Sequence, residues 1–226
     1  MKGTAMNRRH ARLLALSTLV AILVTTVHAG GWSIITLREF PDQALTGQPL
    51  TLTFAVRQHG STLIDGLSPT VRASMAGGAE IQVAALPTLR HGEYTATVRF
   101  PASGEWTLRV DGGFNPGDKT RENNSMVLPP LSVVRQSSVS RIAYTQADRG
   151  DRLFVTKGCV GCHKAGSERD LTKKYFNVDY LKTVLADPGI RTTDMPNLEL
   201  KEHEISALVA FINRAPSTRP VAARSE

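Results

Sequence analysis

The stretch "PLTLTFAVRQ" (Pro49–Gln58) alternates apolar residues with smaller or polar ones along most of its length. In an extended chain its apolar face carries Leu52, Phe54 and Val56, and its other face carries threonine, alanine and arginine. Successive side chains of a β-strand point to opposite faces, so this period of two predicts a strand with one buried and one solvated face.

Six further segments of the first half of the chain have strand character. They are Trp32–Leu37, Thr70–Met75, Glu80–Leu86, Tyr94–Phe100, Glu105–Val110 and Met126–Val134. Turn-forming glycine, proline, asparagine and aspartate residues separate them. About seven short strands with no helical pattern between them predict an antiparallel β-sandwich of immunoglobulin-like type over residues 30–135.

The periodicity changes after a polar, aperiodic segment at residues 136–147, which we interpret as a linker. Helices are predicted at Asp148–Thr156, Val178–Ala186 and Glu202–Arg214, where apolar residues recur every three to four positions. We therefore expect a two-domain chain, with an all-α domain at residues 148–214 and a disordered tail at 215–226. So short a helical domain buries little surface, and we therefore expect a further group to occupy the middle of its core.

The first 29 residues read as an export signal. A basic segment is followed by the apolar run Leu13–Val27 and by small residues around Ala29, where cleavage is expected. The alternative is an uncleaved anchor that contacts the membrane, although the run is shorter than the ~18 residues of a spanning helix. Either interpretation makes the protein periplasmic or otherwise extracytoplasmic.

The net charge of +7 does not indicate nucleic-acid binding. Four of the positive charges lie in the first twelve residues, and residues 30–135 contain nine basic and nine acidic side chains. A nucleic-acid site would need basic residues clustered in the mature protein. That class of function is excluded.

The only two cysteines lie in "KGCVGCHKAG" (Lys157–Gly166). Cys159, Cys162 and His163 form the attachment pattern of c-type haem. Two thiols add across the two vinyl groups of the porphyrin, and the adjacent histidine ligates the iron. Gly158 and Gly161 are expected to keep the backbone slim where the macrocycle passes. A disulfide-exchange site would need a βαβ context, and a structural zinc would need a second pair of ligands.

A second axial ligand is available in "TTDMPNLEL" (Thr192–Leu200). Met195 is the only methionine of residues 148–214, and a thioether ligand raises the reduction potential of haem iron. His203 is the rival ligand, but its acidic neighbours indicate a solvated helix face. If Met195 is only a core residue, the iron stays open, as in a peroxidase-like enzyme.

Residues 148–214 resemble a small class I cytochrome c domain. The segments that carry the resemblance are "GDRLFVTKGCVGCH", "YLKTVLADP" and "MPNLELKEHEISALVAFI". The resemblance implies one covalent haem c on Cys159 and Cys162, with His163 and Met195 as axial ligands of the iron.

The same resemblance implies that the first and last helices cross, with Gly150 and Phe154 meeting Leu208 and Phe211. The short distance from His163 to Met195 implies a trimmed loop and an exposed haem edge. Arg191 or Lys182 could reach a haem propionate, and the sequence does not decide between them.

Residues 30–134 are similar to the YtkA-like or FixH-like extracytoplasmic sandwich modules, through segments such as "GEYTATVRFPASGEWTLRV". Related modules occur in proteins linked to copper handling or oxidase assembly. Four soft donors could serve a copper site: His59, His91, Met75 and Met126. They are not closely spaced, so a module that docks the chain onto a partner is the plainer interpretation.

These observations favour an exported monohaem cytochrome that carries single electrons between a donor and an acceptor protein, and a terminal oxidase or dehydrogenase is a candidate partner. No other acid–base or nucleophile constellation favours an enzyme. The alternatives are a copper-handling or oxidase-assembly module with an accessory haem, and an open-haem redox enzyme subunit.

Overall fold

The computed structural model describes residues 32–113, 124–140, 142–191 and 194–214. The export signal or anchor predicted at residues 1–29 and the tail predicted at 215–226 lie outside the described residues. Among the described residues, no helix is both long enough and apolar enough to cross a membrane.

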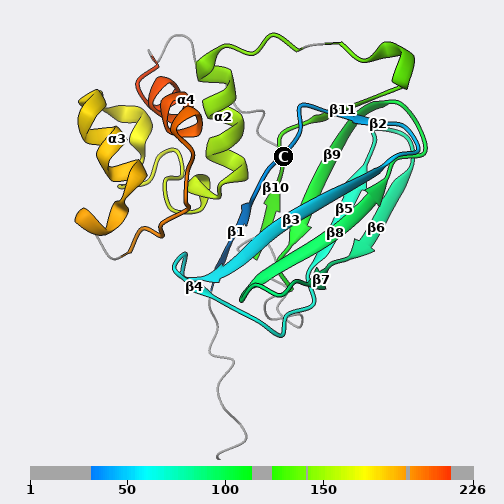
Figure 1. The fold of residues 1–226 in the computed structure, drawn as a ribbon, viewed down its shortest axis with the longest axis horizontal. Coiled ribbons are helices and arrows are strands. Elements are labelled where there is room, and N and C mark those ends of the chain that lie inside the picture. Colours follow the sequence, from blue (N-terminus) through cyan, green and yellow to red (C-terminus); the bar gives the residue numbers. More distant parts are fainter. Residues whose placement is uncertain (1–31, 114–123, 141, 192–193, 215–226) are drawn as a thin grey trace, which may run out of the picture. The chain divides into compact units, whose positions relative to one another are not determined.

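The first part of the chain forms two β-sheets (Figure 1). One sheet has the order β1-β3-β8-β7, with β4 beside β3, and the other has the order β2-β11-β9-β5-β6, with β10 beside β9. The strands are β1 (Ser33–Leu37), β2 (Gln43–Leu45), β3 (Pro49–Gln58), β4 (Thr62–Leu63), β5 (Thr70–Ser74), β6 (Glu80–Ala84), β7 (Leu86–Pro87), β8 (Glu93–Arg99), β9 (Gly104–Asp111), β10 (Ser125–Val127) and β11 (Leu131–Val134).

This strand order confirms the predicted immunoglobulin-like sandwich. The path β1-β3-β8-β7 corresponds to the four-stranded sheet of an immunoglobulin constant-type domain, and β11-β9-β5 corresponds to its three-stranded sheet. All pairings are antiparallel except that of β11 with β2.

The predicted strand Met126–Val134 is wrong as a single element. Pro129 and Pro130 separate β10 from β11, because proline cannot donate a ladder hydrogen bond. The predicted strand Glu80–Leu86 is likewise wrong as a single element, because it covers β6 and the first residue of β7, which lie in different sheets. The sequence also missed β2 and β4, which have only two or three residues each. So short a strand shows no measurable alternation.

The sandwich has a core built from the apolar faces of both sheets. Phe100 and Trp106 are fully buried, and their ring centroids lie 5.1 Å apart in an edge-on arrangement. The indole nitrogen of Trp106 donates a hydrogen bond to the carbonyl of Ala102, so its polar atom is satisfied inside the core. The hydroxyl of Tyr94 likewise donates to the carbonyl of Ile64.

Three α-helices follow the sandwich in the described chain: α2 (Gln146–Thr156), α3 (Val178–Ala186) and α4 (Glu202–Ile212). Short 3₁₀ turns lie at Gln136–Ser138, Cys159–Gly161, Leu171–Lys173 and Pro188–Ile190. Helix α2 begins two residues before its predicted start, inside the predicted linker. Thr145 is the reason, because its side chain accepts a hydrogen bond from the backbone N–H of Asp148 and caps the helix.

Helices α2 and α4 pack against each other, and the expected contact of Gly150 and Phe154 with the last helix is present (Figure 1). A methyl group on Gly150 would lie 2.0 Å from the carbonyl oxygen of Ala207, so only glycine permits this approach. The rings of Phe154 and Phe211 lie 5.1 Å apart, in a small apolar cluster that also contains Leu208.

Candidate functional site

The two cysteines and the histidine lie on one tight turn directly after α2. The backbone N–H groups of Cys162 and His163 both donate to the carbonyl of Cys159, at 3.2 and 2.8 Å. Cys159 and His163 are therefore one helical turn apart, which brings their side chains to the same side of the chain.

A cavity of about 320 Å³ opens beside this turn. Its lining includes all four predicted site residues, Cys159, Cys162, His163 and Met195. The volume lies within the ~300–1,000 Å³ typical of small-molecule and cofactor sites. The structure thus brings together two thiols, an imidazole and a thioether from segments more than thirty residues apart.

His163 has a defined hydrogen-bonding state. Its Nδ1 lies 2.8 Å from the carbonyl oxygen of Arg169, so Nδ1 carries the proton and donates it. In the neutral imidazole, the other ring nitrogen, Nε2, then keeps its lone pair. A backbone carbonyl that fixes the tautomer in this way is typical of histidines that bind a metal through the opposite nitrogen.

The two thiols are free and neutral at pH 7. Burial raises the pKa of Cys159 to about 12, and burial also raises the pKa of Cys162. A disulfide-exchange cysteine needs the opposite shift, because its nucleophile is the thiolate. The electrostatics of this turn therefore do not favour thiol redox chemistry.

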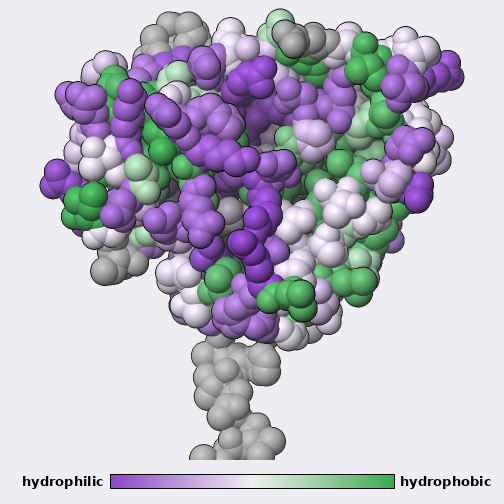
Figure 2. Space-filling model, in the orientation of Figure 1, coloured by the Kyte–Doolittle hydropathy of each residue, from purple (hydrophilic) through white to green (hydrophobic). Residues whose placement is uncertain are grey.

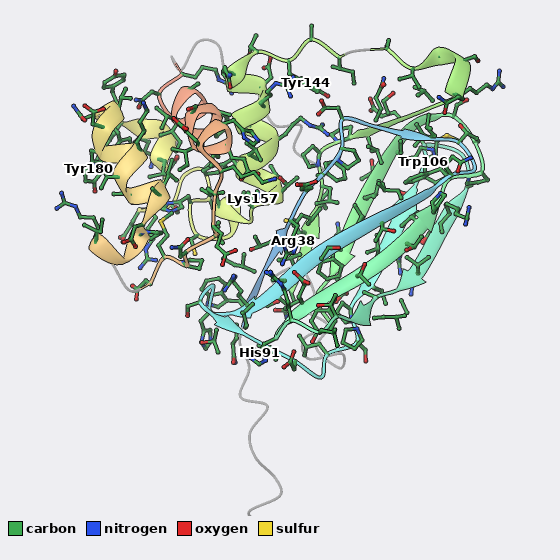
Figure 3. All side chains as sticks on the ribbon, viewed as in Figure 1. Arg38, His91, Trp106, Tyr144, Lys157 and Tyr180 are labelled. Atoms are coloured by element: carbon green, nitrogen blue, oxygen red, sulfur yellow. The ribbon has the colours of Figure 1, made fainter. Side chains whose placement is uncertain are left out.

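The residue before the turn's first glycine forms a buried ion pair. Lys157 Nζ lies 2.9 Å from Glu204 Oε1 on α4, and both side chains are less than one-tenth exposed. The same ammonium donates to the carbonyl oxygen of Arg38 at 2.8 Å; both residues are labelled in Figure 3. Lys157 thus joins three segments that are far apart in the sequence.

Gly158 and Gly161 also approach a strand, and their expected role beside a macrocycle stays a prediction. A methyl group on Gly158, where φ is +75°, would lie 2.5 Å from Ile34 Cγ2 and 2.6 Å from the carbonyl oxygen of Ile35. A methyl group on Gly161 would lie 3.0 Å from the Ile34 side chain. The glycines make room for β1.

Strand β1 also supplies part of the cavity wall, which the sequence did not predict. Ile34 and Thr36 line the cavity with the cysteine turn. One signal was present in the sequence: "SIITL" lacks the regular polar positions of β3 and β9, and all five residues are buried. A strand without a polar face is typical of burial on both sides.

Of the remaining predictions about charged residues near the cavity, some agree with the structure and others do not. Arg191 lies over the ring of Tyr180 at 5.3 Å and Lys182 is exposed, and the cavity lining includes neither. Arg169 lies on the lining instead. His203 is exposed as predicted, whereas Glu204, expected on the same solvated face, is buried against Lys157.

The four soft donors considered for copper occupy separate places. His91 pairs with Asp65, and His59 lies 6.1 Å from the ring of Trp32. Met126 is buried on β10, and Met75 follows β5 beside Gly104. Within the described ranges, no three His, Cys, Asp or Glu side chains are grouped as a metal site. A haem iron needs only one histidine and one methionine from the protein.

No protein-family model matches the chain, and no curated protein matches it. Among solved structures, the Lin-41 filamin domain is 14% identical, with a TM-score of 0.33 over 47% of this chain and 99% of that one. The CARDB domain of the PF1109 protein from Pyrococcus furiosus, solved with di-metal ions, is 17% identical, with a TM-score of 0.29 over 48% and 99%.

A superoxide reductase (neelaredoxin) from Ignicoccus hospitalis is 14% identical, with a TM-score of 0.29 over 45% of this chain and 80% of that one. Likenesses this low carry no argument about the chain. The description of the first part of this chain as a β-sandwich depends on the strand order given above.

Proposed function

We propose that the chain is an exported monohaem c-type cytochrome that carries single electrons between a donor and an acceptor protein. The observation that carries this proposal is the cavity shared by Cys159, Cys162, His163 and Met195. The class I cytochrome c fold of residues 148–214 is part of the proposal, and the packing of α2 against α4 supports it.

The residues of the cavity fit a covalently bound haem. Cys159 and Cys162 would hold the porphyrin by thioether bonds, and His163 would present Nε2 to the iron while its Nδ1 stays bonded to Arg169. Met195 would supply the second, softer ligand. When bound, the haem supplies a centre that gains and loses one electron, and His/Met ligation favours its reduced form.

The wall residues would then protect and orient the group. Ile34, Pro196 and Leu198 give the lining its apolar character, which keeps water from the iron. The ion pair of Lys157 with Glu204 holds the start of the cysteine turn against α4. A site held by so many fixed contacts changes little between oxidation states, which keeps the reorganisation on electron transfer small.

The first test is whether the protein, expressed with export and haem attachment, is coloured. We expect a haem absorption spectrum, one haem per chain, and a haem adduct that remains on the denatured protein. Replacing both cysteines by alanine should abolish the covalent adduct, and Ser167→Ala is a matched control on the adjacent loop. A colourless wild-type protein with two reactive thiols would refute the proposal.

The second test separates an electron carrier from an open-haem enzyme. If Met195 binds the iron, the oxidised protein shows the weak long-wavelength absorption of a thioether on ferric haem. Met195→Ala should remove that band, while the covalent haem remains. A wild-type spectrum without the band, together with rapid binding of added cyanide, would favour the open-haem enzyme instead.

Export and the redox partners belong to the same proposal. Residues 148–214 contain eleven basic and ten acidic side chains, so we expect weak electrostatic steering and transient docking. In the view of Figure 2 the surface over the helices is largely hydrophilic, and an interface that is not permanent is about as apolar as the rest of a protein's surface. The rate of electron transfer to a partner should therefore change little with salt.

A further inference from the structure

The carboxylate of Glu204, in the first turn of α4, is buried and has two different partners. Its Oε1 lies 2.9 Å from the ammonium of Lys157, and both side chains are less than one-tenth exposed. Its Oε2 accepts a hydrogen bond of 2.9 Å from the backbone N–H of Lys201, the residue before α4 begins. Hydrogen bonds to a charged acceptor are the strong ones, so this carboxylate is held in place at both oxygens.

The two partners of Glu204 belong to the two segments that carry the expected iron ligands. Lys157 precedes Cys159 by two positions, on the turn that presents His163. Lys201 follows Met195 by six positions, at the end of the loop that presents the thioether. Glu204 therefore connects the two sides of the cavity through the protein.

The loop from Met195 to Lys201 has a defined shape. The side-chain oxygen of Asn197 accepts a hydrogen bond of 2.9 Å from the backbone N–H of Glu199. Glu199 has a φ of +52°, which residues other than glycine rarely adopt. Met195 and Leu200 both pack against the apolar cluster of the helices. Because the loop is fixed within itself, its anchor at Lys201 also limits where Met195 can lie.

We propose that Glu204 is a positioning residue for Met195: by holding the Lys201 amide, it favours binding of the thioether to the haem iron. The inference rests on the function proposed above. A ligand supplied by the protein competes with added ligands through its effective concentration at the metal, and this concentration falls when its loop gains freedom. Lys157 in turn fixes the Glu204 carboxylate relative to the cysteine turn.

The first experiment measures imidazole binding to the oxidised full-length haem protein, because imidazole displaces a methionine ligand and removes its long-wavelength band. Two double variants lack the buried ion pair equally: Lys157→Met with Glu204→Gln, and Lys157→Met with Glu204→Leu. The glutamine oxygen still accepts from the Lys201 N–H, whereas leucine cannot. We expect the leucine variant to bind imidazole about three- to tenfold more tightly than the glutamine variant. Equal affinities would overturn the inference and leave the proposed function intact.

Asp148→Ala is the matched control. Asp148 accepts a hydrogen bond from the backbone N–H of Thr145 in the same motif at the start of α2, and neither residue lines the cavity. This variant should keep the wild-type affinity for imidazole. A rise as large as that of the leucine variant would show a general loss of stability and would overturn the inference.

A second measurement needs no variant. Because coupling between two sites is reciprocal, displacement of Met195 must weaken the hydrogen bond at Lys201 by the same factor. In the wild type, saturating imidazole should speed hydrogen exchange of the Lys201 amide about three- to tenfold and leave the Thr145 amide unchanged. An unchanged Lys201 amide would overturn the inference even if the leucine variant does not fold. Wild-type protein without haem, or with haem but without the methionine band, would overturn the proposed function as well.

Discussion

Strands β9 and β1 have their inner faces in the same sandwich core but differ on their outer faces. Thr107 and Arg109 on β9 are exposed, as the alternation of the sequence predicts. Ile34 and Thr36 on β1 are buried, because the cysteine turn lies against them. The difference teaches that the strand register alone does not define a solvent face. A second element decides it.

The apolar core of the sandwich and the apolar cluster of the helices also differ in how far each depends on other parts of the molecule. Among the described residues, the sandwich core contains twenty buried side chains and satisfies its buried tryptophan and tyrosine internally. The helical cluster contains eight, and Cys159 and Met195 pack at its edge beside the cavity. The sandwich is therefore expected to be stable by itself, whereas the helices depend on β1, on the buried ion pair and on whatever fills the cavity.

The largest effect is expected from breaking the buried ion pair. Lys157→Met leaves the Glu204 carboxylate buried without its partner, and we expect the free energy of unfolding to fall by about 3–5 kcal/mol. The double variant with Glu204→Leu should recover most of the loss, because neither charge remains. Urea unfolding followed by circular dichroism measures both. Equal stability of the single and double variants would contradict the role of the pair.

The two outer faces can be compared directly by truncation. Ile34→Ala should lower the free energy of unfolding by about 2–4 kcal/mol, because it opens a void between β1 and the cysteine turn. Leu86→Ala removes a side chain that is 66% exposed on β7, and a change within about 0.5 kcal/mol is expected. Thermal unfolding of both variants is the measurement. If they lose the same stability, the outer face of β1 is not a packing surface.

Two glycines with the same backbone conformation allow the cost of a strained backbone to be separated from the cost of a steric clash with β1. Gly158 and Gly47 have φ values of +75° and +74°, but an added methyl group on Gly47 would meet nothing within 4 Å. Alanine at either site costs about 1–2 kcal/mol for the left-handed backbone. Gly158→Ala should lose more than Gly47→Ala, because its methyl group also meets β1. Equal losses would mean that the turn moves away from β1 freely.

The smallest effect concerns the start of α2. Hydrogen bonds from the side chain and the backbone of Thr145 lower the pKa of Asp148 in the folded protein. Its carboxylate therefore stabilises the fold above the unfolded pKa near 4, and this contribution is lost as the pH falls through the lower folded pKa. Asp148→Asn should cost about 1 kcal/mol at pH 7 and almost nothing near pH 2. The melting temperatures of the wild type and of Asp148→Asn, measured between pH 7 and pH 2, provide the comparison. If the two proteins still differ at pH 2, the charge of the Asp148 carboxylate is not the cause of the difference.

The sequence predicted what depends on local periodicity. The alternation in Pro49–Gln58 and the spacing of apolar residues in Glu202–Arg214 located β3 and α4 closely, because each pattern covers several turns or pleats. The motif around Cys159 and Met195, the only methionine of residues 148–214, selected four residues that the fold gathers at one cavity. The haem and the export signal remain predictions.

The parts that the sequence missed are long-range. The hydrogen bond from Lys157 to the Arg38 carbonyl spans 119 positions, and no periodic pattern encodes such a contact. Glu204 resembled an ordinary surface charge because its partner precedes it by almost fifty residues. Thr36 resembled an ordinary strand residue because its neighbours in the cavity come from the other half of the chain.

If the proposed haem is attached, the turn after β3 limits the stage at which attachment can take place. A methyl group on Gly60 would lie only 3.6 Å from Cys162 Sγ, so the tip of that hairpin borders the sulfur. An enzyme that attaches haem must reach the cysteine segment, and in the folded chain the hairpin tip at Gly60 would obstruct access to Cys162. Under the proposed function, haem attachment would therefore have to precede closure, and a sandwich that folds first would set a time window for making the thioether bonds.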